Sequence, residues 1–127
     1  MKTKELSTKE APAAVGAYSQ GQVAGDLIFT SGQIGLDPET NRPIRNNIEA
    51  ETRQVLENLI NVVKAGGGNK NSIVKTTVYV TDLDNYQLIN EIYESIFQDS
   101  LPARSVVEVA DLPKEMNLEI EAIATKA

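Results

Sequence analysis

The residues best suited to chemistry lie near the C-terminal end of the sequence. Arg104 follows Pro102, which restricts the backbone, and a guanidinium there can bind a carboxylate or phosphate through two parallel hydrogen bonds. Glu119 and Glu121 stand two residues apart, so in a strand they share one face, where a cation or a proton must relieve their repulsion. The two glutamates could therefore supply a general acid or base. From the pattern alone, an ion pair with Arg104 or a solvated acidic face is the favoured interpretation.

The composition removes several alternative chemistries. The 127-residue chain has no cysteine and no histidine, which excludes disulfides, a thiol nucleophile and a Ser-His-Asp triad, and disfavours zinc or iron sites. A net charge of −6 disfavours binding to nucleic acid. No apolar stretch is long enough to cross a membrane, and the first five residues are polar, which favours a cytoplasmic protein.

These side chains depend on a sheet that the residue periodicity predicts. Strands are expected at 2–8, 20–24, 27–31, 73–81, 103–109 and 117–125, and Gly25-Asp26 suits a type II′ turn. Helices are expected at 49–65, with Asn47 as N-cap, and from Asp82 or Asp84 to about residue 98. The order β-β-β-α-β-α-β-β describes one two-layer α+β domain over residues 1–127, with both helices on one face of a mixed sheet.

Alternation along the strands predicts which side chains face the helices. Leu118, Ile120, Ala122 and Ala124 are assigned to the helix side, and so are two further sets: Ser105, Val107 and Val109, and Val74, Thr76, Val78 and Val80. The uncovered face then carries Arg104, Glu108, Glu119 and Glu121 beside apolar Ile73, Tyr79, Val106 and Ile123. A face of this mixed kind favours a homo-oligomer.

Four further residues are candidates for a binding site, each with an ordinary structural alternative. Ser31-Gly32 at a strand end could bind a small anion or simply lead into a loop. Tyr18 could cover a site or pack against a strand edge. Asn90 interrupts the apolar pattern of the second predicted helix, so it could hydrogen-bond a ligand or lie on the surface. The three glycines at 66–68 follow a helix rather than begin one, which excludes a phosphate-binding loop.

Several separated segments carry a resemblance to a known family. Residues 102–110 (PARSVVEVA), 112–114 (LPK) and 118–124 (LEIEAIA) closely resemble the signature of the RidA/YjgF family of reactive-intermediate deaminases. Similarity extends over nearly the whole chain, through residues 11–21, 30–34 and 74–83, and through Asn90 with Tyr93. The resemblance implies a chorismate-mutase-like fold and a homotrimer whose helices lie outside and whose ligand sites lie between subunits. It also implies hydrolysis of 2-aminoacrylate and 2-iminobutyrate to 2-keto acids and ammonia, with neither metal nor organic cofactor.

The resemblance also assigns roles to individual residues. Arg104 would hold the substrate carboxylate, and Glu119 would position or activate the attacking water. The pocket would be lined by Ser31 and Gly32 and closed by Tyr18 and Asn90, with backbone hydrogen bonds at Val106. Many relatives carry a cysteine where this chain has Val106, but a backbone contact does not depend on that side chain, so activity is expected to survive.

Two other functions remain open at this point. The same trimer could bind a small metabolite as a regulator, for example of purine or amino-acid metabolism, without turnover. An endoribonuclease activity has been proposed for relatives, but the acidic charge and the missing histidine disfavour it here.

Overall fold

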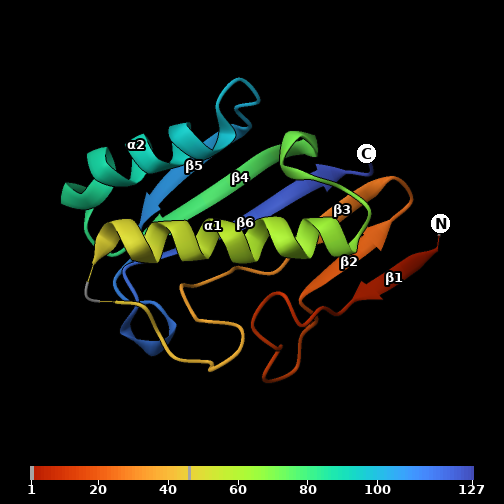
Figure 1. The fold of residues 1–127 in the computed structure, drawn as a ribbon, viewed down its shortest axis with the longest axis horizontal. Coiled ribbons are helices and arrows are strands. Elements are labelled where there is room, and N and C mark those ends of the chain that lie inside the picture. Colours follow the sequence, from red (N-terminus) through yellow and green to blue (C-terminus); the bar gives the residue numbers. More distant parts are fainter. Residues whose placement is uncertain (1, 46) are drawn as a thin grey trace.

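A mixed sheet and two helices form the protein, seen in a computed structural model that describes residues 2–45 and 47–127 (Figure 1). The strands are β1 (Thr3–Leu6), β2 (Gly21–Ala24), β3 (Leu27–Thr30), β4 (Ile73–Val80), β5 (Ala103–Glu108) and β6 (Leu118–Thr125). The helices are α1 (Ile48–Ala65) and α2 (Tyr86–Phe97), and short 3₁₀ turns occupy Lys70–Ser72, Leu83–Asn85 and Pro113–Glu115. The predicted α+β class and the predicted order of strands and helices are confirmed.

The helix boundaries follow the local signals in the sequence. The Asn47 side chain accepts a hydrogen bond from the Ala50 amide at 3.1 Å, which confirms it as the N-cap of α1. Asp82 caps the short 3₁₀ turn that leads into α2 rather than α2 itself. Gly25 in the β2–β3 turn has a φ of 61°, which suits the predicted hairpin.

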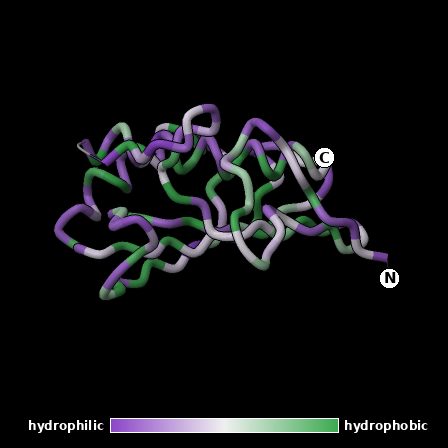
Figure 2. The backbone as a smooth tube through the Cα atoms, turned by 90° about the horizontal axis from the view of Figure 1, so that it is seen from below, coloured by the Kyte–Doolittle hydropathy of each residue, from purple (hydrophilic) through white to green (hydrophobic). Residues whose placement is uncertain are grey.

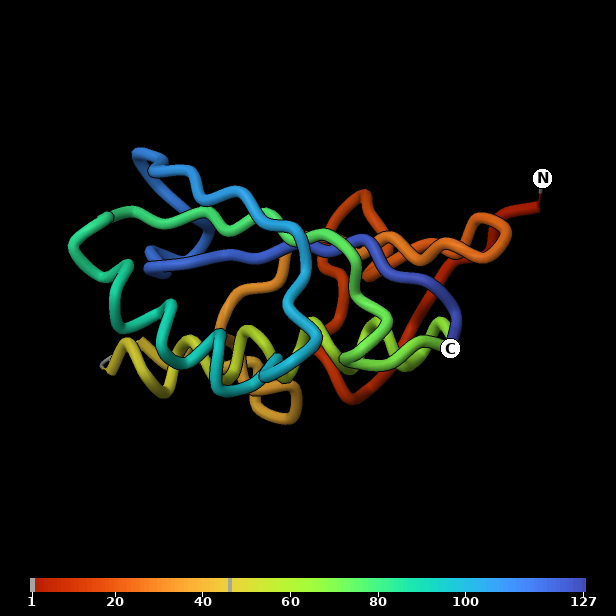
Figure 3. Tube along the Cα trace, turned by 90° about the horizontal axis from the view of Figure 1, so that it is seen from above, coloured from red at the N-terminus to blue at the C-terminus, as the bar shows by residue number. Residues whose placement is uncertain are grey.

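The sheet has the order β1-β2-β3-β6-β4-β5. Every neighbouring pair is antiparallel except β4 and β5, which run parallel and are joined through α2. Figure 3 shows α1 and α2 on the same side of the strands. The core lies between these two layers, where the side chains of Leu118, Ile120 and Ala124 on β6 are completely buried. The predicted helix side of β6 is therefore confirmed.

The predicted orientation of β5 is wrong. Arg104 pairs with Thr76 across the parallel ladder, and Val106 pairs with Val78. Thr76 and Val78 are buried under the helices, so their ladder partners Arg104 and Val106 face the helices as well. Val106 packs against the core, while Val107 is 42% exposed on the opposite face. Each of the two faces of β5 carries a valine, so the sequence of the strand alone does not show which face lies toward the helices. The register between β5 and β4 decides it.

One end of β4 also differs from the prediction. The β4–β6 register shifts between Ile73 and Lys75, and this irregularity turns Ile73 inward and Val74 outward. The uncovered face of the sheet consequently keeps Tyr79 and Ile123 but loses Ile73 and Val106. It gains three exposed apolar side chains: Leu27, Phe29 and Val107.

Apolar residues occur in short stretches along the whole chain. Figure 2 shows hydrophobic and hydrophilic segments alternating along the tube. Among the described residues, no helix is both long enough and apolar enough to span a membrane.

Candidate functional site

The residues predicted to form one site separate into two groups on opposite faces of the sheet. Tyr18, Gly32 and Glu119 line one pocket of about 390 Å³. Arg104 and Asn90 line a different one, of about 260 Å³, on the helix side. The predicted placement of Arg104 beside Glu119 and Glu121 on a single uncovered face is therefore wrong, and the ion pair considered for it does not form.

Glu119 occupies the centre of the first group. It is the second residue of β6, and the backbone of Gln33 bonds to Ile120 in both directions, at 2.8 and 3.0 Å. The chain at Gly32 thus runs directly beside the glutamate. A Cβ on Gly32 would lie 2.5 Å from Oε2 of Glu119 and 2.6 Å from Cδ, so only glycine leaves room for this carboxyl group.

The Glu119 carboxyl is electrostatically perturbed. Its partial burial raises its pKa above the ordinary value, and the nearby charge of Glu121 raises it further. Glu121 in turn accepts a hydrogen bond from the Tyr79 hydroxyl at 2.9 Å, which keeps the pKa of Tyr79 raised as well. A carboxyl with a raised pKa in a pocket is suited to exchanging a proton with a bound molecule or water.

The walls of the Glu119 pocket are mainly apolar. They include Pro12, Ala13, Val15, Ile34, Leu36 and Pro113, and the polar groups beside Glu119 are Tyr18, Gln20, Gln33, Asn41 and Lys114. Asn41 and Lys114 both have a positive φ, 60° and 56°, an uncommon conformation for residues other than glycine. Neither residue was predicted from the sequence to belong to a site, although Lys114 lies within a segment that carries the family resemblance.

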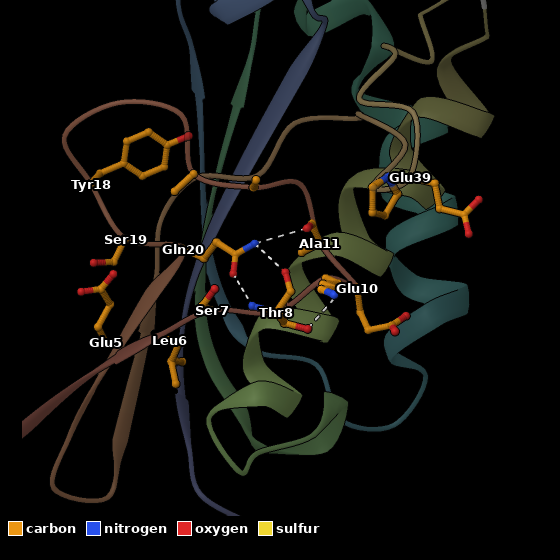
Figure 4. Close-up of a pocket in the computed structure, with 14 residues that line it drawn as sticks. Glu5, Leu6, Ser7, Thr8, Glu10, Ala11, Tyr18, Ser19, Gln20 and Glu39 are labelled. Atoms are coloured by element: carbon orange, nitrogen blue, oxygen red, sulfur yellow. Dashed lines mark hydrogen bonds between the residues drawn. The ribbon is translucent and has the colours of Figure 1, made fainter.

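A buried glutamine holds the loop that carries Tyr18. The Gln20 side chain accepts from the Thr8 amide at 2.7 Å and donates to the carbonyl oxygens of Thr8, Ala11 and Pro12 at 3.0, 3.2 and 2.8 Å. Figure 4 shows this amide between Thr8 and Ala11 at the edge of a wider groove of about 910 Å³. That groove contains neither Glu119 nor Arg104, so the smaller pocket is the better candidate. Tyr18 itself is 54% exposed.

Arg104 lies among aromatic side chains of α2. Its guanidinium carbon is 4.8 Å from the ring centroid of Tyr93 and 5.6 Å from that of Tyr86, and its Nη2 donates to the Tyr86 hydroxyl at 2.9 Å. The Tyr93 hydroxyl is fixed in turn by a 2.6 Å hydrogen bond with Thr76. The two salt bridges found among residues 2–45 and 47–127 do not involve Arg104. The aromatic rings therefore orient a guanidinium that keeps donors for a ligand.

Two predicted residues lie in neither pocket. The Ser31 hydroxyl donates to the carbonyl oxygen of Ser19, and Ser31 lines a shallow hollow with Gln22 and Phe29 instead. The Val106 side chain faces the core, so only its backbone could contact a ligand. Among the described residues, no group of three or more acidic side chains could hold a metal ion.

The fold and the pocket together describe a small α+β protein with a mainly apolar pocket around one carboxyl group. The model of the family Endoribonuclease L-PSP matches residues 8–126, and the chain belongs to this family, the RidA/YjgF family.

Curated relatives match the chain at nearly full length. A protein of Rattus norvegicus named 2-iminobutanoate/2-iminopropanoate deaminase is 45% identical, over 97% of this chain and 90% of the relative. The protein of the same name from Escherichia coli strain K12 is 45% identical over 98% of both chains.

Solved structures share the fold. The yjgF gene product of E. coli superimposes with a TM-score of 0.93 at 45% identity, covering 98% of this chain and 99% of the other. E. coli TdcF, solved with bound serine, gives a TM-score of 0.93 at 42% identity with the same coverage. Yeast Mmf1 gives 0.96 at 36% identity, covering 99% of this chain and all of the other.

Proposed function

We propose that this chain is a 2-iminobutanoate/2-iminopropanoate deaminase, which hydrolyses reactive imino acids to 2-keto acids and ammonia. The observation that carries the proposal is the Glu119 carboxyl, partly desolvated and with a raised pKa, in a pocket of about 390 Å³. The names of the relatives with 45% identity support the same activity.

The chemistry requires little beyond correct placement. An enamine such as 2-aminoacrylate first tautomerises to its imine, gaining a proton on carbon and losing one from nitrogen. Water then adds to the imine carbon while Glu119 accepts a proton from it and passes that proton to the nitrogen, which gives the carbinolamine. Glu119 next takes the proton of the carbinolamine hydroxyl and delivers it to the amino group, so ammonia leaves as the carbon–oxygen double bond forms. Arg104 binds the substrate carboxylate by a bidentate contact. Backbone groups near Val106 and the side chains of Tyr18 and Asn90 border the substrate, and Gly32 completes the wall.

One copy of the chain separates Arg104 from Glu119 by the thickness of the sheet, so the active site requires a second copy. The uncovered sheet face offers apolar area for such an assembly, since Leu27, Phe29 and Val107 are 41%, 39% and 42% exposed there. We extend the proposal to a chorismate-mutase-like homotrimer of single-domain subunits, residues 1–127 each. In this assembly Arg104 of one copy meets Glu119 of its neighbour. The cytoplasmic location remains a prediction.

The test is a coupled assay. A serine or threonine dehydratase generates the imino acid, and the appearance of the keto acid is followed with and without the protein. A catalytic amount of protein should shorten the lag before keto acid appears, and Glu119→Gln should lengthen it again. Glu49→Gln is the matched control, because Glu49 is exposed on α1, away from both pockets. An unchanged lag at excess wild-type protein would refute the proposal for that substrate.

A second function is favoured by a single observation. The solved structure of TdcF contains bound serine, which suits a protein that senses a small metabolite without turning it over. Calorimetric titration with serine or 2-ketobutyrate distinguishes the two functions. Tight binding without any effect on the dehydratase lag would favour a regulator.

A further inference from the structure

Three polar side chains of α1 are completely buried: Glu51, Thr52 and Asn58. The Thr52 hydroxyl donates within the helix, to the carbonyl oxygen of Ile48 at 2.7 Å, whereas the other two side chains reach other segments. Glu51 and Asn58 each have an exposed fraction of 0%, and they lie seven residues apart, so both point from the same side of the helix. Neither residue lines the Glu119 pocket. Burying a carboxylate and an amide is costly unless their hydrogen bonds are satisfied, so their partners indicate what the two residues do.

Glu51 holds the first residues of β6. Its Oε2 accepts hydrogen bonds from the backbone amides of Asn117 and Leu118 at 2.8 and 3.2 Å, and its Oε1 accepts from the Asn117 side chain at 2.8 Å. The next residue in the chain is Glu119. One buried carboxylate therefore fixes the backbone immediately before the proposed base.

Asn58 holds the opposite wall of the same pocket. Its Nδ2 donates to the carbonyl oxygens of Ile34 and Leu36 at 3.0 and 2.9 Å. Between these two carbonyls lies Gly35, where a Cβ would come within 2.9 Å of Cγ of Glu51. The segment that contains Gly32 is thus packed against the same helix that holds the start of β6.

We propose that Glu51 and Asn58 are positioning residues, which together set the separation between the Gly32 wall and the Glu119 carboxyl. The inference rests on the proposed deaminase function for its kinetic consequence, but its structural part can be measured without activity. Gly32 and Glu119 lie so close that a shift of either segment by a fraction of an ångström alters the position and hydration of the carboxyl.

The variants are chosen to separate positioning from folding. Glu51→Met has nearly the same length but accepts none of the three hydrogen bonds. Glu51→Gln retains an oxygen for the two backbone amides, and the Asn117 amide can turn to accept from the new NH₂ group. Asn117→Ala removes only the hydrogen bond between the side chains of Asn117 and Glu51. This variant still tests the proposal if Glu51→Met does not fold. Glu49→Gln on the exposed side of α1 is the matched control.

The kinetic readout is the pH profile of deamination. We expect kcat of Glu51→Met to fall about 10- to 100-fold with KM changed less than threefold, because substrate binding at Arg104 is untouched. Glu51→Gln should recover most of the rate, and Asn117→Ala should lose less than Glu51→Met. A folded Glu51→Met or Asn117→Ala with wild-type kcat and an unchanged profile would overturn the proposal.

A second readout needs no activity. The titratable groups around Glu119 are Glu121 on the same strand, Tyr79 on β4, and Tyr18 and Lys114 across the pocket, and none of them is altered in these variants. We expect the pKa of Glu119, measured by NMR titration of its carboxyl carbon, to fall toward its ordinary value in Glu51→Met and less so in Asn117→Ala. If the wild type proves inactive but this shift appears, only the proposed function fails. An unchanged titration in the folded variants refutes the positioning role.

Discussion

Replacing Gly32 with alanine places a methyl group where the Glu119 carboxyl now lies. The new Cβ would be 2.5 Å from Oε2, whereas ordinary contact with a Cβ begins at 3.4 Å. The backbone at this position cannot easily retreat, because Gln33 is bonded to Ile120 on β6. The carboxyl must therefore move by roughly 1 Å, a displacement that can reduce the rate about 100-fold. Folding should change little, because the clash falls on a half-buried side chain that can rotate toward solvent.

The dehydratase-coupled assay measures this loss, and a double-mutant cycle shows its cause. If alanine acts only by displacing the carboxylate, Gly32→Ala should have almost no further effect on the residual rate of Glu119→Gln. Full activity in Gly32→Ala would refute the assigned role of Glu119. An equally large loss in both backgrounds would mean that alanine damages the pocket in some other way.

Four further variants test other parts of the molecule. Arg104→Ala should lower kcat/KM about 10- to 100-fold, the value of one charged hydrogen-bonded contact, and leave the fold intact, as judged by circular dichroism; an unaltered kcat/KM would argue against a carboxylate contact. Glu121→Gln removes one of the two causes of the raised pKa of Glu119, so the acid limb of the kcat/KM profile should move to lower pH, and a limb that stays in place would exclude that electrostatic coupling. The pKa of Glu119 is higher in the folded protein than in the unfolded chain, so its protonated form stabilises the fold below the unfolded pKa. This stabilisation is lost as the pH rises through the folded pKa. Glu119→Gln should therefore be more stable than wild type near pH 7 but not near pH 3. Gln20→Ala should lower the free energy of unfolding in urea by about 1–3 kcal/mol and speed proteolysis within residues 8–18, since it leaves the Thr8 amide and three carbonyl groups without their partner.

Local patterns predict most of this fold correctly. The Asn47 cap, the extent of α1 and the alternation of β6 each depend on neighbours within a few residues, and each is confirmed. The orientation of β5 depends instead on its register with β4, a contact between segments about 28 residues apart, as the pairing of Thr76 with Arg104 illustrates. No local signal in β5 contains that information.

In the candidate site, too, local sequence predicts some features, and others depend on contacts between distant segments. Gly32 and Glu119 were candidates from the residue pattern, and the family resemblance placed them in one pocket, but their close approach emerges only from the backbone of the folded chain. Glu51 and Asn58 were missed, although they fall on the same helical stripe as Val55 and Val62, which are completely buried. Polar residues within an apolar stripe are a readable signal of buried hydrogen bonds, and this signal was present in the sequence.

In the proposed deaminase, the separation of Arg104 and Glu119 on two sides of one sheet makes catalysis a property of the assembly rather than of the chain. If each site takes its arginine from one copy and its glutamate from the next, two variants that are inactive alone can repair one another. Arg104→Ala and Glu119→Gln subunits, mixed in equal amounts and reassembled, should regain about a quarter of the wild-type sites, since each site needs an intact half from both neighbours. By the same reasoning, activity per chain should fall on dilution to concentrations at which the copies separate.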